Sequence, residues 1–164
     1  MKKVTKLISD LVLAVLVIAV LIFALPRLFG VHMFSVLSGS MEPSYHVGDL
    51  IYAVPAEADE IEAGDVISFL LNDDGRVATH RVVEVEEGNQ RFYTKGDANE
   101  VRDGSPVHYN NVIGVVRFRI PLLGYAAGFL STMAGKITAV TLIAVYVILI
   151  LIFSKGKKQE ESLD

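Results

Sequence analysis

Two long apolar runs, one near each end, constrain the fold of this chain more than any other feature of its sequence. Residues 11–25 contain no polar side chain, and residues 137–153 contain no charge. A helix rises about 1.5 Å per residue and the hydrocarbon core of a bilayer is about 30 Å thick, so each run with its flanks is close to the length of a spanning helix. The sequence therefore predicts a domain of about a hundred residues between two transmembrane helices.

The charges that flank the two runs predict their orientation. Lys2, Lys3 and Lys6 precede the first run, and a lysine-rich segment at 155–158 follows the second. Because positively charged flanks tend to stay in the cytoplasm, both ends are predicted to be cytoplasmic and the segment between them extracytoplasmic. Residues 31–136 carry 15 Asp and Glu against 8 Lys and Arg, a net charge of −7, which suits the outer side.

These flanks divide the chain into six predicted segments. They are a cytoplasmic N-terminus (1–6), a first transmembrane helix (7–28), an extracytoplasmic domain (29–119), an interfacial connection (120–136), a second transmembrane helix (137–153) and a cytoplasmic tail (154–164). Two alternatives stay open. The first run could be a cleaved signal peptide, although no convincing cleavage site follows it and Pro26 fits the end of a spanning helix. The uncharged residues 120–135 could be a third span, which Pro121 and three glycines disfavour.

The segment between the runs is typical of β-structure. Five stretches rich in Val, Ile, Phe and Tyr are separated by groups of turn-forming residues. They are Asp49–Val54, Asp65–Leu71, Thr79–Glu87, Gln90–Gly96 and Asn111–Ile120. A hairpin is expected across Gly88–Asn89, and residues 54–64 are expected to form a polar connection with a helical turn. Five or six short strands predict a mainly-β fold, a small antiparallel barrel or sandwich.

A tight turn soon after the first run supplies the candidate nucleophile. Residues 38–43 read Ser-Gly-Ser-Met-Glu-Pro. The glycine between Ser38 and Ser40 lets the backbone take an angle that projects a side chain and exposes amide N–H groups. Those are the requirements for a serine nucleophile with an oxyanion hole. Taken alone the pattern is weak evidence, because a turn with capping serines is commoner.

A serine nucleophile needs a base, and the base needs an orienting carboxylate. Of the four histidines, His80 lies in an apolar–polar alternation that indicates a strand, which could hold an imidazole rigidly. A histidine on the surface of a strand is the plainer alternative. Asp97 and Asp103 lie in one predicted loop, where Asp also serves turn formation. The sequence leaves open which of the two would pair with His80.

Other kinds of site find little support in the sequence. The chain has no Cys, which excludes disulfides and thiolate metal sites. No His-x-x-x-His or calcium-loop pattern occurs, so we expect no metal and no cofactor. The middle segment has no basic cluster that suggests nucleic acid. Met41 and the apolar residues of 120–133 are candidates for resting the domain on lipid, with core packing as the equal alternative.

Four segments together resemble the motifs of the type I signal peptidases, in the family's order. Residues 38–43 are similar to the nucleophile box, 64–69 to the second box, 79–85 to the general-base box and 93–103 to the acidic box. Most bacterial members have a lysine before the arginine of the base box, whereas this chain has His80 before Arg81. That resembles the branch of the endoplasmic reticulum enzyme, archaea and some Gram-positive bacteria.

This resemblance implies a role for each candidate residue. Ser40 would be the nucleophile, and its backbone N–H together with the Ser38 hydroxyl would bind the oxyanion. His80 would be the general base and Asp103 its triad partner. Asp97 would be a further acid of the site, important in the family but less certain in role.

The resemblance also implies substrates and a location. A signal peptidase removes N-terminal signal peptides from secretory preproteins at the outer membrane surface. The expected partners are signal peptides, the lipid bilayer, and partner subunits or the secretion translocon. The expected location is the plasma membrane, or the endoplasmic reticulum membrane in a eukaryote. Cleavage after small residues implies shallow apolar pockets, which residues 34–37 and 67–71 could line. Two alternatives remain, a peptidase with a narrow substrate set and a non-catalytic membrane-anchored β-domain that binds a partner.

Overall fold

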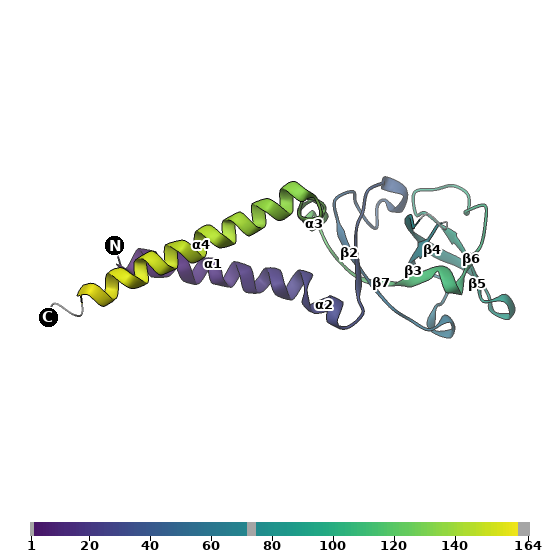
Figure 1. Ribbon diagram of the computed structural model, residues 1–164. Helices are drawn as coiled ribbons and strands as arrows, with labels where there is room; N and C mark the ends of the chain where they lie inside the picture. The colour runs from purple at the N-terminus through teal and green to yellow at the C-terminus, as the bar shows by residue number, and fades with distance from the viewer. Residues whose placement is uncertain (1, 72–74, 161–164) are drawn as a thin grey trace. The chain divides into compact units, whose positions relative to one another are not determined.

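The computed structural model of this chain describes residues 2–71 and 75–160. Part of the turn-forming group after the second predicted strand, 72–74, and the last residues of the tail, 161–164, lie outside the described residues. By its internal contacts the chain divides into two units. Residues 22–127 form one unit, which holds the described strands, and residues 1–21 with 128–164 form the other, which holds most of the two long helices (Figure 1).

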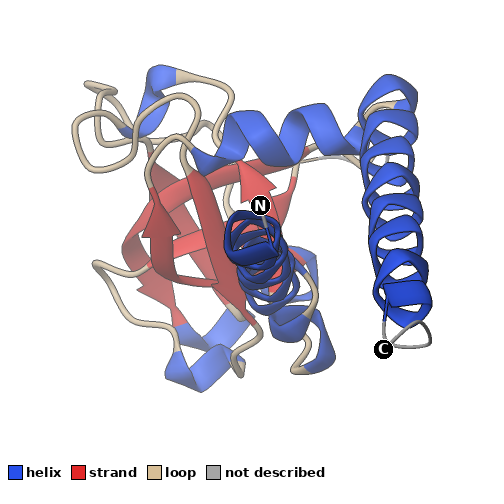
Figure 2. Cartoon of the chain, turned by 90° about the vertical axis from the view of Figure 1, so that its left-hand side faces the viewer, coloured by secondary structure: helices blue, strands red, loops and turns tan. Residues whose placement is uncertain are grey.

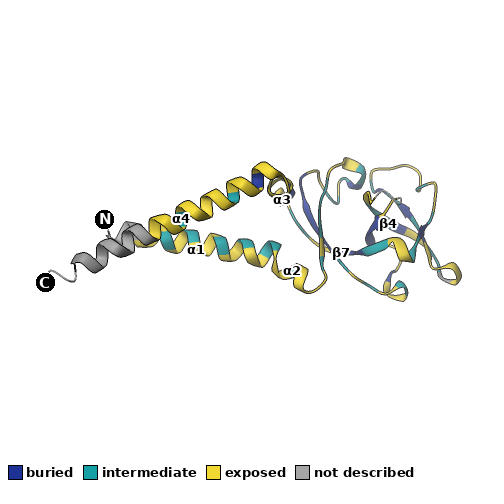
Figure 3. Cartoon of the chain, viewed as in Figure 1, coloured by how far each residue is buried: buried dark blue, intermediate teal, exposed yellow. Residues whose placement is uncertain are grey.

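The long helices carry the two apolar runs. Helix α1 spans Lys2–Phe23 and is followed by the short α2, Leu25–Leu28, while α4 spans Met133–Glu160. By length and composition, Lys6–Leu28 and Met133–Ile150 could each cross a membrane. Figure 3 shows α1 and α4 mainly in the colour of exposed residues, so their apolar side chains are uncovered. A surface this apolar is typical of a membrane or protein contact.

The long helices extend beyond the predicted spans, since α1 begins at Lys2 rather than at residue 7 and α4 ends at Glu160 rather than at residue 153. Helix α4 begins at Met133 rather than at Ile137, and the predicted connection also contains helix α3, Leu123–Ser131. The glycines that the sequence counted against a third span lie within these two helices, and the predicted connection is mostly helical.

The strands form one seven-stranded sheet in which every described pair is antiparallel. They are β1 (His32–Ser35), β2 (Leu50–Val54), β3 (Val66–Leu70), β4 (Val77–Glu86), β5 (Arg91–Lys95), β6 (Val107–His108) and β7 (Val112–Ile120). The order across the sheet is β1-β2-β7-β3-β4-β5-β6. Figure 2 shows these strands in red, with short helical turns in the connections. The predicted mainly-β, antiparallel fold is confirmed.

The connections between the strands agree in part with those predicted from the sequence. Strands β4 and β5 form the expected hairpin, which turns through the 3₁₀ helix η3, Glu87–Asn89. The helical turn expected in residues 54–64 is η2, Ala58–Glu60, and a further turn, η4, covers Tyr109–Asn111. Strands β1 and β6 were not predicted, because stretches of four and two residues carry too little alternation to be recognised.

Two apolar clusters fill the interior of the β-domain. The larger consists of Ile61, Ile67, Phe69, Val82, Phe92, Val107 and Val115. The smaller consists of Met41, Ile51, Val66 and Val116. Of the two alternatives for Met41, core packing is therefore the correct one, since its side chain is only 3% exposed. This burial anchors the predicted nucleophile turn to the core.

Of the residues predicted to line substrate pockets, 34–37 and 67–71, some are buried in the core and others are exposed. Ile67 and Phe69 belong to the larger cluster, so the 67–71 stretch offers only its end to solvent. Phe34 and Val36 pack against the smaller cluster. Leu37, by contrast, is 86% exposed and directly precedes Ser38.

Candidate active site

The serine turn folds as the short 3₁₀ helix η1, Gly39–Met41, in the loop that follows β1. Ser38 precedes η1 in an extended conformation, and its side chain makes no capping hydrogen bond. The Ser38 hydroxyl instead lies 3.4 Å from the Oγ of Ser40. The first N–H groups of a helix have no partner within it, so the Ser40 N–H in η1 has no acceptor inside the helix. The turn therefore places the Ser38 hydroxyl next to the Ser40 hydroxyl.

His80 contacts Ser40 through one ring nitrogen and Asp103 through the other. Its Nε2 lies 3.2 Å from Ser40 Oγ, and its Nδ1 lies 2.7 Å from Asp103 Oδ2. On β4 it pairs with Ile67 of β3, and the Phe69 ring lies edge-on to the imidazole. Its side chain is 17% exposed. A paired strand thus fixes the ring while one edge stays accessible.

Asp103 is oriented by Thr94, a buried residue of β5. The Thr94 hydroxyl donates to Asp103 Oδ2 at 2.6 Å, and the Asp103 N–H donates to the Thr94 carbonyl at 2.8 Å. A carboxylate beside Nδ1 favours the tautomer in which that nitrogen carries the proton, which leaves the Nε2 lone pair directed at Ser40. The pairing that the sequence left open is therefore to Asp103, and Thr94 is a residue that sequence reasoning missed.

Asp97 takes part in a different contact, an ion pair with Arg81. The Nε and Nη2 of Arg81 donate to its two carboxylate oxygens at 2.8 and 2.7 Å. These hydrogen bonds hold the pKa of Asp97 below its ordinary value, and the same pairing raises the pKa of Arg81. Arg81 Nη1 also donates to the Gly64 carbonyl at 2.7 Å. Asp97 thus fastens the acidic loop to β4 instead of contacting the imidazole.

The acidic loop also contacts the serine turn through its backbone. The Ala98 N–H donates to the Ser40 carbonyl at 2.9 Å. Gly96 lies so close that a Cβ there would be 2.6 Å from the same carbonyl oxygen. Only glycine fits this approach without a shift, and the Gly-Asp pair at 96–97 is the sequence signal that could have indicated it. The Asp97–Arg81 pair therefore holds a loop that braces Ser40.

The other histidines have different partners. His46 lies 3.3 Å from Glu42 at an exposed position, His32 stacks on Phe34, and His108 accepts from the Asn110 N–H. Within residues 2–71 and 75–160, no group of three or more His, Cys, Asp or Glu side chains could hold a metal ion.

The arrangement has the parts required for acyl transfer. The Ser40 hydroxyl contacts the His80 imidazole, which contacts the Asp103 carboxylate. The Ser40 proton can therefore pass to His80 while Asp103 stabilises the imidazolium. The Ser38 hydroxyl lies 3.4 Å from the Ser40 hydroxyl and is a candidate donor to a negative oxygen formed there. The three residues come from separate elements, η1, β4 and the loop after β5, which the fold brings together.

Comparison with known proteins identifies a family and several relatives. The profile of the family described as "Signal peptidase, peptidase S26" matches residues 8–97, just over half of the chain. Signal peptidase I W of Bacillus subtilis (strain 168) is 41% identical over 90 residues, which are 53% of this chain and 47% of that protein. Signal peptidase complex catalytic subunit SEC11C of Homo sapiens is 37% identical over 99 residues, 54% of this chain and 52% of that protein. The chain thus spans about half the length of these curated relatives.

Proposed function

Because this chain belongs to the signal peptidase family, peptidase S26, we propose that it is a membrane-anchored serine endopeptidase that removes N-terminal signal peptides from preproteins. The observation that carries the proposal is the continuous series of contacts from Ser40 to His80 to Asp103, at 3.2 and 2.7 Å. A non-catalytic binding domain would have no use for a hydroxyl, an imidazole and a carboxylate that contact one another in this order.

In the first half of the reaction, Ser40 Oγ attacks the carbonyl carbon of the scissile bond. His80 Nε2 takes the hydroxyl proton as the new C–O bond forms, and Asp103 stabilises the resulting imidazolium through Nδ1–H. The oxyanion accepts hydrogen bonds from the Ser40 N–H and the Ser38 hydroxyl. His80 then gives the proton to the departing amine, which becomes the new N-terminus of the mature protein.

In the second half, water hydrolyses the acyl-enzyme. His80 takes a proton from the water, whose oxygen attacks the ester carbonyl, and returns it to Ser40 Oγ as the ester bond breaks. The signal peptide leaves with a new carboxylate. In this scheme Asp97 is a positioning residue, since its contact with Arg81 holds the loop that braces the Ser40 carbonyl.

The apolar helices fit the same function. We propose that α1 and α4 span the bilayer with both chain ends in the cytoplasm, which puts the β-domain on the extracytoplasmic side. A signal peptide lies in the membrane as an apolar segment, so its cleavage site emerges where an anchored peptidase can reach it. The location would be the plasma membrane, or the endoplasmic reticulum membrane in a eukaryote. SEC11C is named as the catalytic subunit of a complex, and partner subunits are proposed here on that likeness.

A cleavage assay in membranes tests this proposal. A secretory preprotein is incubated with membranes that carry the wild-type chain, Ser40→Ala or Ser105→Ala, and the product's new N-terminus is sequenced. Ser105 is an exposed serine close to Asp103 and is a matched control. We expect the wild type and Ser105→Ala to cut after the small residue of the signal peptide and Ser40→Ala to be inactive. Cleavage by Ser40→Ala, or failure of the wild type on several preproteins, would contradict the proposal.

A further inference from the structure

The loop that carries Ser40 is closed at its base by backbone hydrogen bonds. The Val36 N–H donates to the Asp49 carbonyl and the Gly48 N–H donates to the Val36 carbonyl, both at 2.9 Å. Residues 37–47 thus form a loop whose two ends are hydrogen-bonded to each other. Ser38 is only two residues from Val36. The base of the loop is therefore close in the chain to the first serine of the turn.

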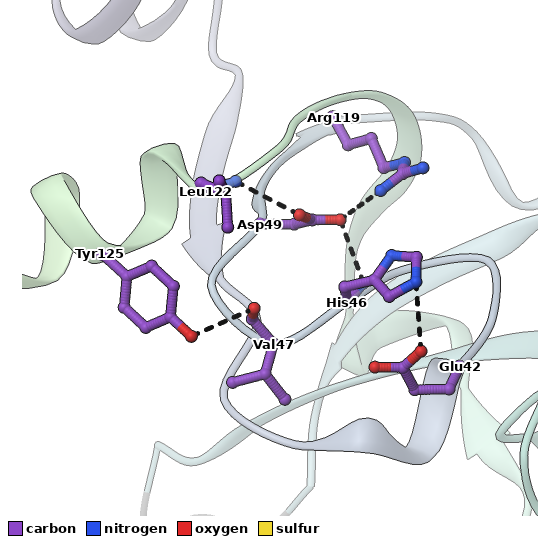
Figure 4. A network of polar contacts seen from close by, with 7 residues as sticks. All are labelled: Glu42, His46, Val47, Asp49, Arg119, Leu122 and Tyr125. Carbon is purple, nitrogen blue, oxygen red and sulfur yellow. Dashed lines mark hydrogen bonds and ion pairs between the residues drawn. The ribbon is translucent and has the colours of Figure 1, made fainter.

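A buried carboxylate at this base binds the end of β7 and the residues that follow it. Asp49 is 1% exposed. Its carboxylate accepts from the His46 N–H at 3.0 Å, from the Leu122 N–H at 3.4 Å and from the Arg119 guanidinium (Figure 4). Burial alone would raise the pKa of Asp49, but these three donors outweigh it and lower the pKa. A charge this deeply buried is stable only because it is paired.

The first turn of α3 lies directly against the same base. The Gly124 N–H donates to the Gly48 carbonyl at 2.8 Å, and the Ser35 hydroxyl donates to the Gly124 carbonyl at 2.9 Å. The Tyr125 hydroxyl donates to the Val47 carbonyl at 3.4 Å (Figure 4). The fit leaves no spare room, because a Cβ on Gly124 would lie 2.4 Å from the Asp49 carbonyl oxygen.

We propose that residues 119–125 form a strap that positions the nucleophile loop, with Asp49 as its principal contact. The proposal rests on the proposed function, since it concerns where Ser40 Oγ stands relative to His80 Nε2. The strap lies beyond residues 8–97, the part that the family profile matches. A misplacement of about 1 Å caused far from the reacting atoms can cost on the order of 10²-fold in rate. Residues that never touch substrate would therefore control kcat.

Two glycines of one helix provide a matched test. Gly124→Ala forces its Cβ against the Asp49 carbonyl, whereas Gly128→Ala, one helical turn later, meets no atom within 4 Å. Both variants replace a glycine of α3 with alanine, and they differ chiefly in the contact with Asp49. In the full chain in detergent, we expect Gly124→Ala to lower kcat about tenfold or more while KM stays within about twofold. Gly128→Ala should keep the wild-type kcat and KM.

A second variant separates positioning from folding. Asp49→Asn keeps the shape of the side chain and removes the charge that pairs with Arg119. Thermal unfolding and circular dichroism give the amount of folded enzyme, to which kcat is normalised. If the strap positions Ser40, both Asp49→Asn and Gly124→Ala should have a lower kcat per folded molecule than the wild type.

The outcomes are distinct. An unchanged kcat per folded molecule in the variants that fold would overturn the inference, and so would loss of folding in both, because the contact would then be structural. If the wild type and Gly128→Ala were themselves inactive, the proposed function would have failed instead.

Discussion

Replacing Asp97 with asparagine tests whether the acidic loop acts through its ion pair with Arg81. The carboxylate accepts two charge-assisted hydrogen bonds, at 2.8 and 2.7 Å. An asparagine keeps one oxygen and the shape of the side chain, so one of these bonds is lost and the other becomes neutral. Hydrogen bonds to charged groups contribute about 1.5–3 kcal/mol. Because the Arg81 side chain is 34% exposed, solvent screening reduces the expected loss to about 1–2 kcal/mol.

The loss of stability in Asp97→Asn should depend on pH, in a direction that the pKa shift of Asp97 sets. The pKa of Asp97 is lowered in the folded protein from its ordinary value of 3.8. Its ion pair therefore contributes stability that is fully present above about pH 4 and is lost as the pH falls through the lower folded pKa. The amide of the substituted side chain does not titrate. The wild type should thus exceed Asp97→Asn in stability near neutral pH, and the difference should shrink near pH 3.

Urea unfolding of the full chain in detergent at the two pH values measures this difference, and preprotein cleavage gives the accompanying change in activity. If displacement of Ser40 cost the transition state the same free energy that the fold loses, kcat would fall about tenfold. Asp103→Asn, which alters the carboxylate next to His80, serves as the comparison and should lose far more activity. Two results would refute the reasoning: equal stability of wild type and Asp97→Asn at neutral pH, or a fully stable Asp97→Asn that is as inactive as Ser40→Ala.

Three further substitutions have expected outcomes. Ser38→Ala removes an oxyanion donor and should lower kcat by about 10²–10³ with little change in KM, measured by steady-state cleavage kinetics; wild-type activity would remove Ser38 from the oxyanion site. Thr94→Val removes the hydroxyl that donates to Asp103 and should lower kcat about tenfold, since such a bond contributes about 1.5–3 kcal/mol; an unchanged kcat would show that Asp103 needs no such partner. Met41→Ala leaves a cavity beneath the serine turn and should lower the free energy of unfolding by about 2–5 kcal/mol, measured by denaturant titration; a loss below about 1 kcal/mol would mean that the site collapses around the smaller side chain.

Much of the β-domain could be predicted because its long strands follow simple patterns. The alternation around His80 indicated a strand, and β4 covers it from Val77 to Glu86. The five strands expected from apolar stretches are all present, within a few residues of their predicted ends. Strands β1 and β6 escaped prediction because pairing with β2 and β5, rather than their own sequences, makes them strands.

The contacts of the site were harder to predict than its members. Asp97 and Asp103 are both acids in one loop, and only the path of that loop decides that Asp103 meets His80 while Asp97 meets Arg81. For Met41 the sequence left lipid contact and core packing as equal alternatives, and the structure shows it in the core, in a loop that closes at Val36 and Asp49. Such outcomes depend on contacts between residues far apart in sequence, which no local pattern records.

The mass of the enzyme during turnover tests the role of Ser40 as the nucleophile. A signal peptide substrate is mixed with the full chain, the reaction is stopped by acid within one turnover, and the enzyme is digested for mass spectrometry. A Ser40 nucleophile predicts a signal peptide fragment joined as an ester to Ser40, absent from Ser40→Ala and depleted in His80→Ala. Cleavage with no adduct at any time point, or with an adduct on another residue, would contradict it.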